Sequence, residues 1–247
     1  MSPVHVATRS VVTAVLAALV AVAGYLGDLP VAGLAAALAL VFALGWPALL
    51  DLPYPPGSAA VVALGGIGGV FAVHSAIEQP FLRFLPVVFA GAILLAFVNE
   101  MLRRDGREGL VESVSGTVAG TLVAIAVSGW VATGRTPGGE GLVVTGALAL
   151  AVASAVTVVR LSPWTRAIVT ALAGAAAGTL GAYALPSVAP VAGAVLGLAV
   201  GVLMASLSTL FHRLPALGRR TPALAAVTLP VTVTGLVVYV AGRVLVG

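Results

Sequence analysis

Apolar residues run along this chain in long stretches, separated by short breaks that are rich in proline, glycine and charge. Each stretch is close to the ~20 residues that a helix needs to cross a bilayer core of about 30 Å. The breaks carry turn chemistry, as in GDLP, DLPYPPG, RRDGREG and TGRTPGGEG. The pattern predicts nine membrane-spanning helices, with eight as the main alternative, at residues 11–26, 31–50, 58–74, 84–102, 111–132, 142–159, 167–185, 191–211 and 223–246.

The composition excludes a water-soluble protein. Hydrophobic residues make up 60% of the 247 residues and charged residues only 8%, whereas a soluble domain carries roughly 25% charged residues. A soluble surface cannot be covered with so few charges, so the apolar stretches must face lipid or each other. We therefore predict an all-α polytopic transmembrane helix bundle that forms one integral membrane domain over residues 1–247, with no soluble domain.

The arginines indicate the orientation in the membrane, because positively charged loops stay on the cytoplasmic side during insertion. With a cytoplasmic N-terminus, the cytoplasmic side holds nine arginines and the outside three. The nine are Arg9, Arg103, Arg104, Arg107, Arg160, Arg166, Arg213, Arg219 and Arg220, and the three are Arg83, Arg135 and Arg243. They form no continuous basic face, which argues against a nucleic-acid partner. The first span also resembles a signal peptide, and its cleavage is a second reading of that segment.

Glycines recur four residues apart in three predicted spans, where they let helix backbones approach closely. The pairs are Gly116 with Gly120 and Gly174 with Gly178, and the eighth span holds the triple Gly193, Gly197 and Gly201. We expect packing within the chain rather than dimerisation, although a packing partner or a homo-oligomer stays open. Two further segments, GGIGG at 65–69 and TLPVTVTG around Pro230, have two interpretations: a harmless kink or tight packing, which we favour, or interrupted helices like those at transporter sites.

The densest polar region joins the fourth and fifth spans, from Asn99 to Thr117. Glu100 lies three and four residues before Arg103 and Arg104, a spacing that brings helical side chains together. Arg104 can reach Glu108 in the same way if the helix persists that far. Intramembrane ionisable groups are functional candidates, and a partly exposed ion network at the membrane rim is the structural alternative. The candidate substrate-binding or pathway residues are Asn99, Glu100, Glu112, Ser113 and Thr117.

Cofactor chemistry finds no support in the sequence. The chain has no cysteine, and its three histidines, His5, His74 and His212, lie far apart without metal-ligand spacing. His74 near Glu78 is a candidate proton-relay pair, with an interfacial histidine as the ordinary interpretation. We expect no metal site, no catalytic residue set and no cofactor.

The segment LRRDGREGLVESVSGTVAG, with its flanking spans, resembles a group of uncharacterised actinobacterial multi-pass membrane proteins loosely labelled permease. This resemblance implies a helical architecture and a location in the bacterial plasma membrane. It supplies no binding or catalytic residues that can be transferred to this chain.

Three functional hypotheses follow from these observations. The first is a permease or transporter of a small or lipid-like solute, based on the interrupted helices and on the polar side of the fifth span. The second is a membrane-embedded accessory or assembly protein that packs through its glycine stripes. The third, an integral-membrane enzyme acting on a lipid-linked substrate, has only the carboxylates of the hairpin between spans four and five to support it.

Overall fold

The computed structural model describes residues 6–104, 108–185, 187–211 and 214–245, and every long element among them is a helix. Within these residues nine spans are long and apolar enough to cross a membrane, which confirms the predicted number. The helices are α1 (Val6–Leu26), α2 (Asp28–Leu49), α3 (Pro55–His74), α4 (Leu85–Leu102), α5 (Leu110–Ala126), α6 (Ser128–Gly134), α7 (Gly139–Val156), α8 (Pro163–Ala184), α9 (Pro190–Phe211) and α10 (Arg220–Leu245), with a short 3-10 turn, η1 (Pro215–Gly218), before α10.

Proline and glycine set several of the helix boundaries. Proline lies in the first turn of α3, α4 and α8, where the missing N–H would have no helical partner in any case. Gly109 and Gly138 precede α5 and α7 with φ angles of 64° and 72°, in the left-handed region that glycine adopts at low cost. The turn chemistry of the sequence therefore lies at the observed helix ends, within a few residues of the predicted spans.

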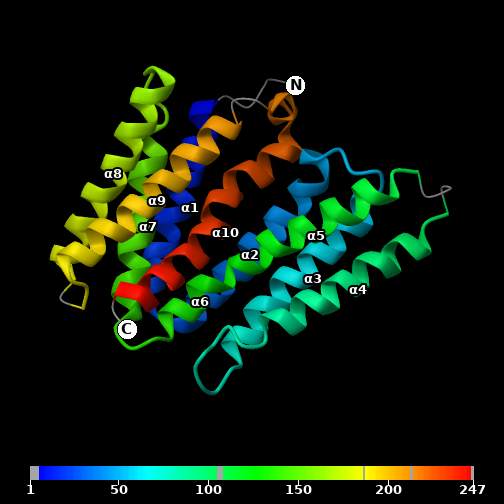
Figure 1. Cartoon of the computed structure of the whole chain (residues 1–247), viewed down its shortest axis with the longest axis horizontal. Helices are drawn as coiled ribbons and strands as arrows, with labels where there is room; N and C mark the ends of the chain where they lie inside the picture. The colour runs from blue at the N-terminus through cyan, green and yellow to red at the C-terminus, as the bar shows by residue number, and fades with distance from the viewer. Residues whose placement is uncertain (1–5, 105–107, 186, 212–213, 246–247) are drawn as a thin grey trace.

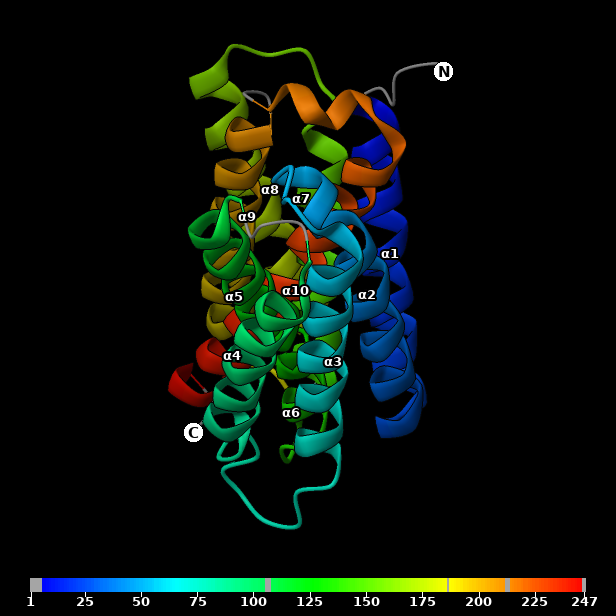
Figure 2. The same ribbon diagram turned by 90° about the vertical axis from the view of Figure 1, so that its right-hand side faces the viewer.

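Helix α10 forms the centre of the bundle. It contacts α1, α7 and α9 on one side and α2, α5 and α6 on the other (Figures 1 and 2). Small residues allow these contacts to be close: a Cβ atom added to Gly129 of α6 would lie 2.4 Å from the backbone of Gly235 in α10. Beside this crossing, the buried Trp130 donates a hydrogen bond from Nε1 to the Val231 carbonyl at 2.8 Å.

The glycine stripes of α8 and α9 pack against each other. A Cβ atom on Gly174 would lie 2.5 Å from the carbonyl oxygen of Gly197, and one on Gly178 would lie 2.2 Å from that of Gly193. The expectation that these glycines pack within the chain is therefore confirmed. Close backbone approach of this kind is how lipid-immersed helices gain van der Waals contact.

Of the two interpretations of the third and ninth spans, the structure contradicts the interrupted helix and leaves the kink or tight packing. Helix α3 runs unbroken through GGIGG, and α10 runs unbroken through Pro230. The threonines around Pro230 donate to nearby carbonyls of their own helix, those of Leu224, Leu229 and Pro230, rather than to the Ala226 carbonyl that proline leaves without its helical donor. The fifth span is the interrupted one, because α5 ends at Ala126 and α6 begins at Ser128.

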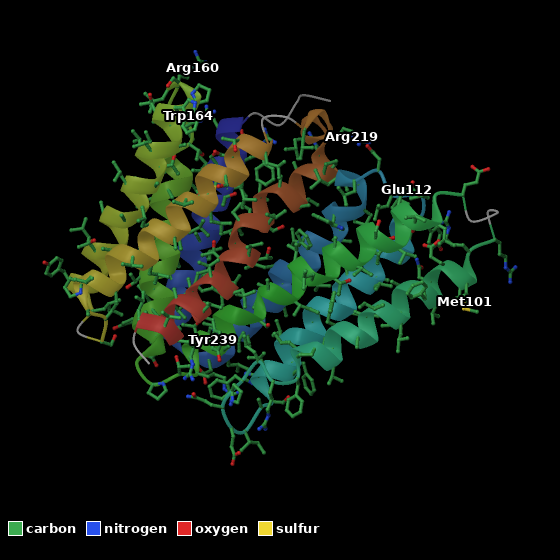
Figure 3. The ribbon with its side chains drawn as sticks, viewed as in Figure 1. Met101, Glu112, Arg160, Trp164, Arg219 and Tyr239 are labelled. Atoms are coloured by element: carbon green, nitrogen blue, oxygen red, sulfur yellow. The ribbon has the colours of Figure 1, made fainter. Side chains whose placement is uncertain are left out.

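The described ends of the chain lie at opposite ends of the bundle (Figure 1). Arg160, Arg219 and Glu112 lie towards the end that holds the start of α1, whereas Tyr239 lies towards the other (Figure 3). We call these the arginine-rich end and the opposite end. The arginine-rich end is the one predicted to face the cytoplasm.

Candidate functional site

The hairpin between α4 and α5 contains a buried ion pair at the arginine-rich end. Glu100 is 3% exposed and Arg103 is 6% exposed, and Arg103 Nη1 lies 2.6 Å from Glu100 Oε2. Ser113, on α5, donates from Oγ to Glu100 Oε1 at 2.5 Å. The Asn99 amide also lies 3.5 Å from Oε1. The carboxylate is therefore held by a charged donor from its own helix end and by a hydroxyl donor from the next helix.

The local chain path brings these groups together. Helix α4 ends at Leu102, and Arg103 follows as its C-cap in an extended conformation. Its guanidinium then turns back to Glu100 and also donates from Nη2 to the Glu108 carbonyl at 3.1 Å. Gly109, the residue after Glu108, is the N-cap of α5. Glu100, Arg103 and Ser113 thus form what we call the hairpin latch, which fixes the end of α4 to the start of α5.

Two of the expected pairings in this hairpin are wrong. Arg104 and Glu108 are both exposed, and the helix ends before either residue, so the helical spacing on which their pairing depended does not exist. For the same reason Glu100 pairs with Arg103 and not with Arg104. The ion pair is also fully buried rather than partly exposed. Arg107 lies outside the described residues.

The predicted polar side of the fifth span points into the bundle. Thr117 donates from Oγ1 to Ser58 Oγ of α3 at 2.8 Å, and Thr121 donates to the Thr117 carbonyl at 2.9 Å. Ser113, Thr117 and Thr121 are all 1% exposed or less. They form a polar stripe along α5 that lies against α3 and, at Ser113, against α4. The sequence indicated this stripe but did not indicate Ser58.

Glu112 does not join the other candidates. Its side chain is exposed in the first turn of α5, at the arginine-rich end (Figure 3). A carboxylate at this position interacts favourably with the positive end of the helix dipole. Of the five candidates, the structure therefore joins Asn99, Glu100 and Ser113, places Thr117 about one turn deeper, and separates Glu112.

A groove lies between α3 and α4 at about the middle of both helices. It has a volume of about 420 Å³ and is lined only by apolar residues: Leu64, Gly65, Val88, Gly91, Ala92, Leu94, Leu95 and Val98. A Cβ atom on Gly91 would meet nothing within 4 Å, whereas one on Gly65 would meet Thr121 of the polar stripe at 2.4 Å. The wall of the groove at Gly65 therefore separates lipid from the polar stripe. The sequence singles out Gly65, as part of GGIGG, but gives no indication of the groove.

Helix α4 is the least buried of the spans. In its most apolar stretch 17% of the residues are buried, against 33% or more in each other span found among the described residues. The groove and the exposed side chains of α4, such as Leu94 and Phe97, therefore lie at the edge of the bundle. The groove has the shape and polarity to accept an alkyl chain.

In the described part of the chain, no three histidine, aspartate or glutamate side chains lie close enough together to bind a metal ion. His74 lies at the end of α3 with a buried Nδ1 that has no hydrogen-bond partner, and Glu78 is exposed in the following loop. His5 and His212 lie outside the described residues. The chemistry at hand is therefore that of a neutralised ion pair, a row of hydroxyls and an apolar groove.

Comparison with known proteins adds no information about the function of these residues. No protein-family model, curated protein or solved structure matches this chain.

Proposed function

We propose that this multi-pass membrane protein is a permease for a lipid-like amphiphile, which enters sideways from the bilayer through the groove between α3 and α4. The observation that carries this proposal is the position of the groove: it faces lipid, and the polar stripe of α5 lies directly behind its wall at Gly65. An amphiphile needs both environments, because its chain is stable in an apolar groove while its polar head is costly to place in hydrocarbon.

The proposed movement is a separation of α4 from α3. Helix α4 has few buried residues along its length and is fixed at the arginine-rich end by the hairpin latch. Elements with little buried apolar contact open at low free-energy cost. Opening would expose Ser58, Thr117 and Thr121 to the groove, so that the head of the solute could exchange hydrogen bonds with hydroxyls while its chain stays in lipid.

The groove can be filled without disturbing the fold, because Gly91 faces open space. We expect the leucine side chain of Gly91→Leu to occupy the groove and to slow translocation by at least about tenfold. A tenfold lower rate corresponds to an activation barrier that is higher by about 1.4 kcal/mol. The measurement is the transfer of a phospholipid with a fluorescent group on a short acyl chain between the leaflets of vesicles that contain the purified protein. Gly33→Leu is the matched control, because a Cβ atom on Gly33 of α2 also meets nothing within 4 Å.

Folded yield of both variants should equal that of the unchanged protein, since a Cβ atom at either position meets nothing within 4 Å and leucine forms helix better than glycine. Wild-type transfer rates in Gly91→Leu would show that the groove is not the path. Equal rates in vesicles with and without the unchanged protein would refute transport of this class of solute.

A second candidate function is a membrane-embedded accessory protein, and the exposure of α4 is the observation that favours it. Large apolar side chains on the outward side of α4, including Phe97 and Met101, are more than half exposed. A photo-reactive residue at position 97 separates the two functions in native membranes. Crosslinks to lipid alone would favour the permease, and a single crosslinked protein band together with absent transfer activity would favour the accessory role.

A further inference from the structure

A second cavity, separate from the groove, lies near the opposite end of the bundle, where α6, α7 and α10 meet the loop after α3. It has a volume of about 130 Å³, and its lining includes Gln79, Thr133, Thr136, Tyr239 and Arg243. The apolar part of its wall includes Leu142. No residue of the hairpin latch or of the groove contributes to it.

Tyr239 is unusual among the tyrosines and tryptophans of this chain because it lies well inside a span rather than at a span end or in a loop. It is six residues before the end of α10, or about 9 Å at 1.5 Å per helical residue. Its side chain is 9% exposed and lines the cavity, and it lies towards the opposite end of the bundle (Figure 3). The hydroxyl makes no hydrogen bond to any other residue that the structure describes. The residue as a whole is buried, but its hydroxyl oxygen is not a fully enclosed atom, so this O–H is open to the cavity and free to serve a ligand.

The other unused polar groups around the cavity are also donors. Arg243 donates from Nη1 to Gln79 Oε1 at 3.1 Å, which occupies the acceptor of Gln79 and leaves its amide N–H groups and the rest of the guanidinium available. Thr133 and Thr136 already donate their hydroxyl hydrogens to the carbonyls of Gly129 and Thr133. Among the described residues that line the cavity there is no carboxylate. The site therefore offers a positive charge and free N–H and O–H donors.

We propose that this cavity binds a small carboxylate. A carboxylate is acceptor-only and matches both the planar guanidinium of Arg243 and the free hydroxyl of Tyr239. The volume is well below the roughly 300–1,000 Å³ of drug-sized sites and suits a ligand of a few heavy atoms. The chain of such a ligand would rest against Leu142. This site is independent of the proposed amphiphile path, which uses other helices and the other end of the bundle.

The probes are acetate and its neutral isostere acetamide, added to the purified full chain in detergent, with binding measured by calorimetry and by the midpoint of thermal unfolding. We expect acetate to bind and to raise the midpoint, and acetamide to do neither at the same concentration. Arg243→Gln and Tyr239→Phe should each weaken acetate binding by about tenfold or more, as expected for charge-assisted hydrogen bonds. Arg83→Gln is the matched control, because Arg83 is an exposed arginine in a loop on the same face, stacked on Phe84.

The unliganded variants should unfold at the wild-type temperature, because the Tyr239 hydroxyl holds no other group and Arg243 is exposed. Equal binding of acetate and acetamide, or an equal loss of binding in Arg83→Gln, would overturn the proposal. Inorganic phosphate is the third probe, and binding of phosphate without binding of acetate would overturn the assignment to carboxylates.

Discussion

At the scale of single residues, the Glu100 carboxylate has the most definite role, because it is the acceptor for both Arg103 and Ser113 in a site closed to water. Removing one member of a buried ion pair leaves the other charge uncompensated, which costs about 3–5 kcal/mol. We expect Glu100→Gln to lower the free energy of unfolding in detergent micelles by about 3 kcal/mol or more. Glu112→Gln is the control on the same hairpin, and because Glu112 is exposed its effect should stay within about 0.5 kcal/mol. Equal unfolding of the two variants would contradict a latch.

Part of this latch could be predicted from the sequence. The pairing of Glu100 with Arg103 follows from a spacing of three residues near a helix end, and the approach of Ser113 follows from the tight turn between two spans. The bond between Thr117 and Ser58 joins residues 59 positions apart, and no local pattern indicates it. Only one feature of the sequence pointed to the cavity at Tyr239, namely a tyrosine that lies too deep in its span for the membrane interface. The other residues that line the cavity come from three other segments of the chain.

At the scale of helices, the contact between α8 and α9 depends on the absence of side chains. A Cβ atom on Gly197 would lie 2.2 Å from the Gly174 carbonyl oxygen and 3.0 Å from the Gly178 Cα, and both are backbone atoms that cannot rotate away. We expect Gly197→Val to force the helices apart and to lower the free energy of unfolding by at least about 2 kcal/mol, in the range known for overpacked sites. Gly33→Val, in open space on α2, should change it by less than about 1 kcal/mol. A similar stability of both variants would show that the helices do not depend on this seam.

The hydropathy pattern predicted the positions of the helices well, but it did not predict which helices are interrupted. A span is fixed by about 20 apolar residues in a row, and that information is local. Whether proline or glycine interrupts a helix depends on its neighbours, which are not local. Pro230 lies in a helix that six other helices surround, and packing keeps it continuous. The break at Val127 falls where Trp130 inserts towards α10, directly before Ser128 and Gly129, a serine–glycine pair of the kind that marks turns and kinks.

At the scale of the whole molecule, nine spans among the described residues require Val6 and Leu245 to lie on opposite sides of the membrane, and the arginine count predicts which side is which. The native chain has no cysteine, so a single introduced thiol reports its own location without background. Glu78 and Glu108 are both exposed, in the loops after α3 and α4. We expect Glu78→Cys to react with a membrane-impermeant maleimide in intact cells and Glu108→Cys to react only after the membrane is opened. The reverse result would keep the fold and invert the orientation, because an inverted bundle has the same helices and contacts. Labelling of both positions from outside would refute the number of spans between them, since one helix, α4, separates the two loops.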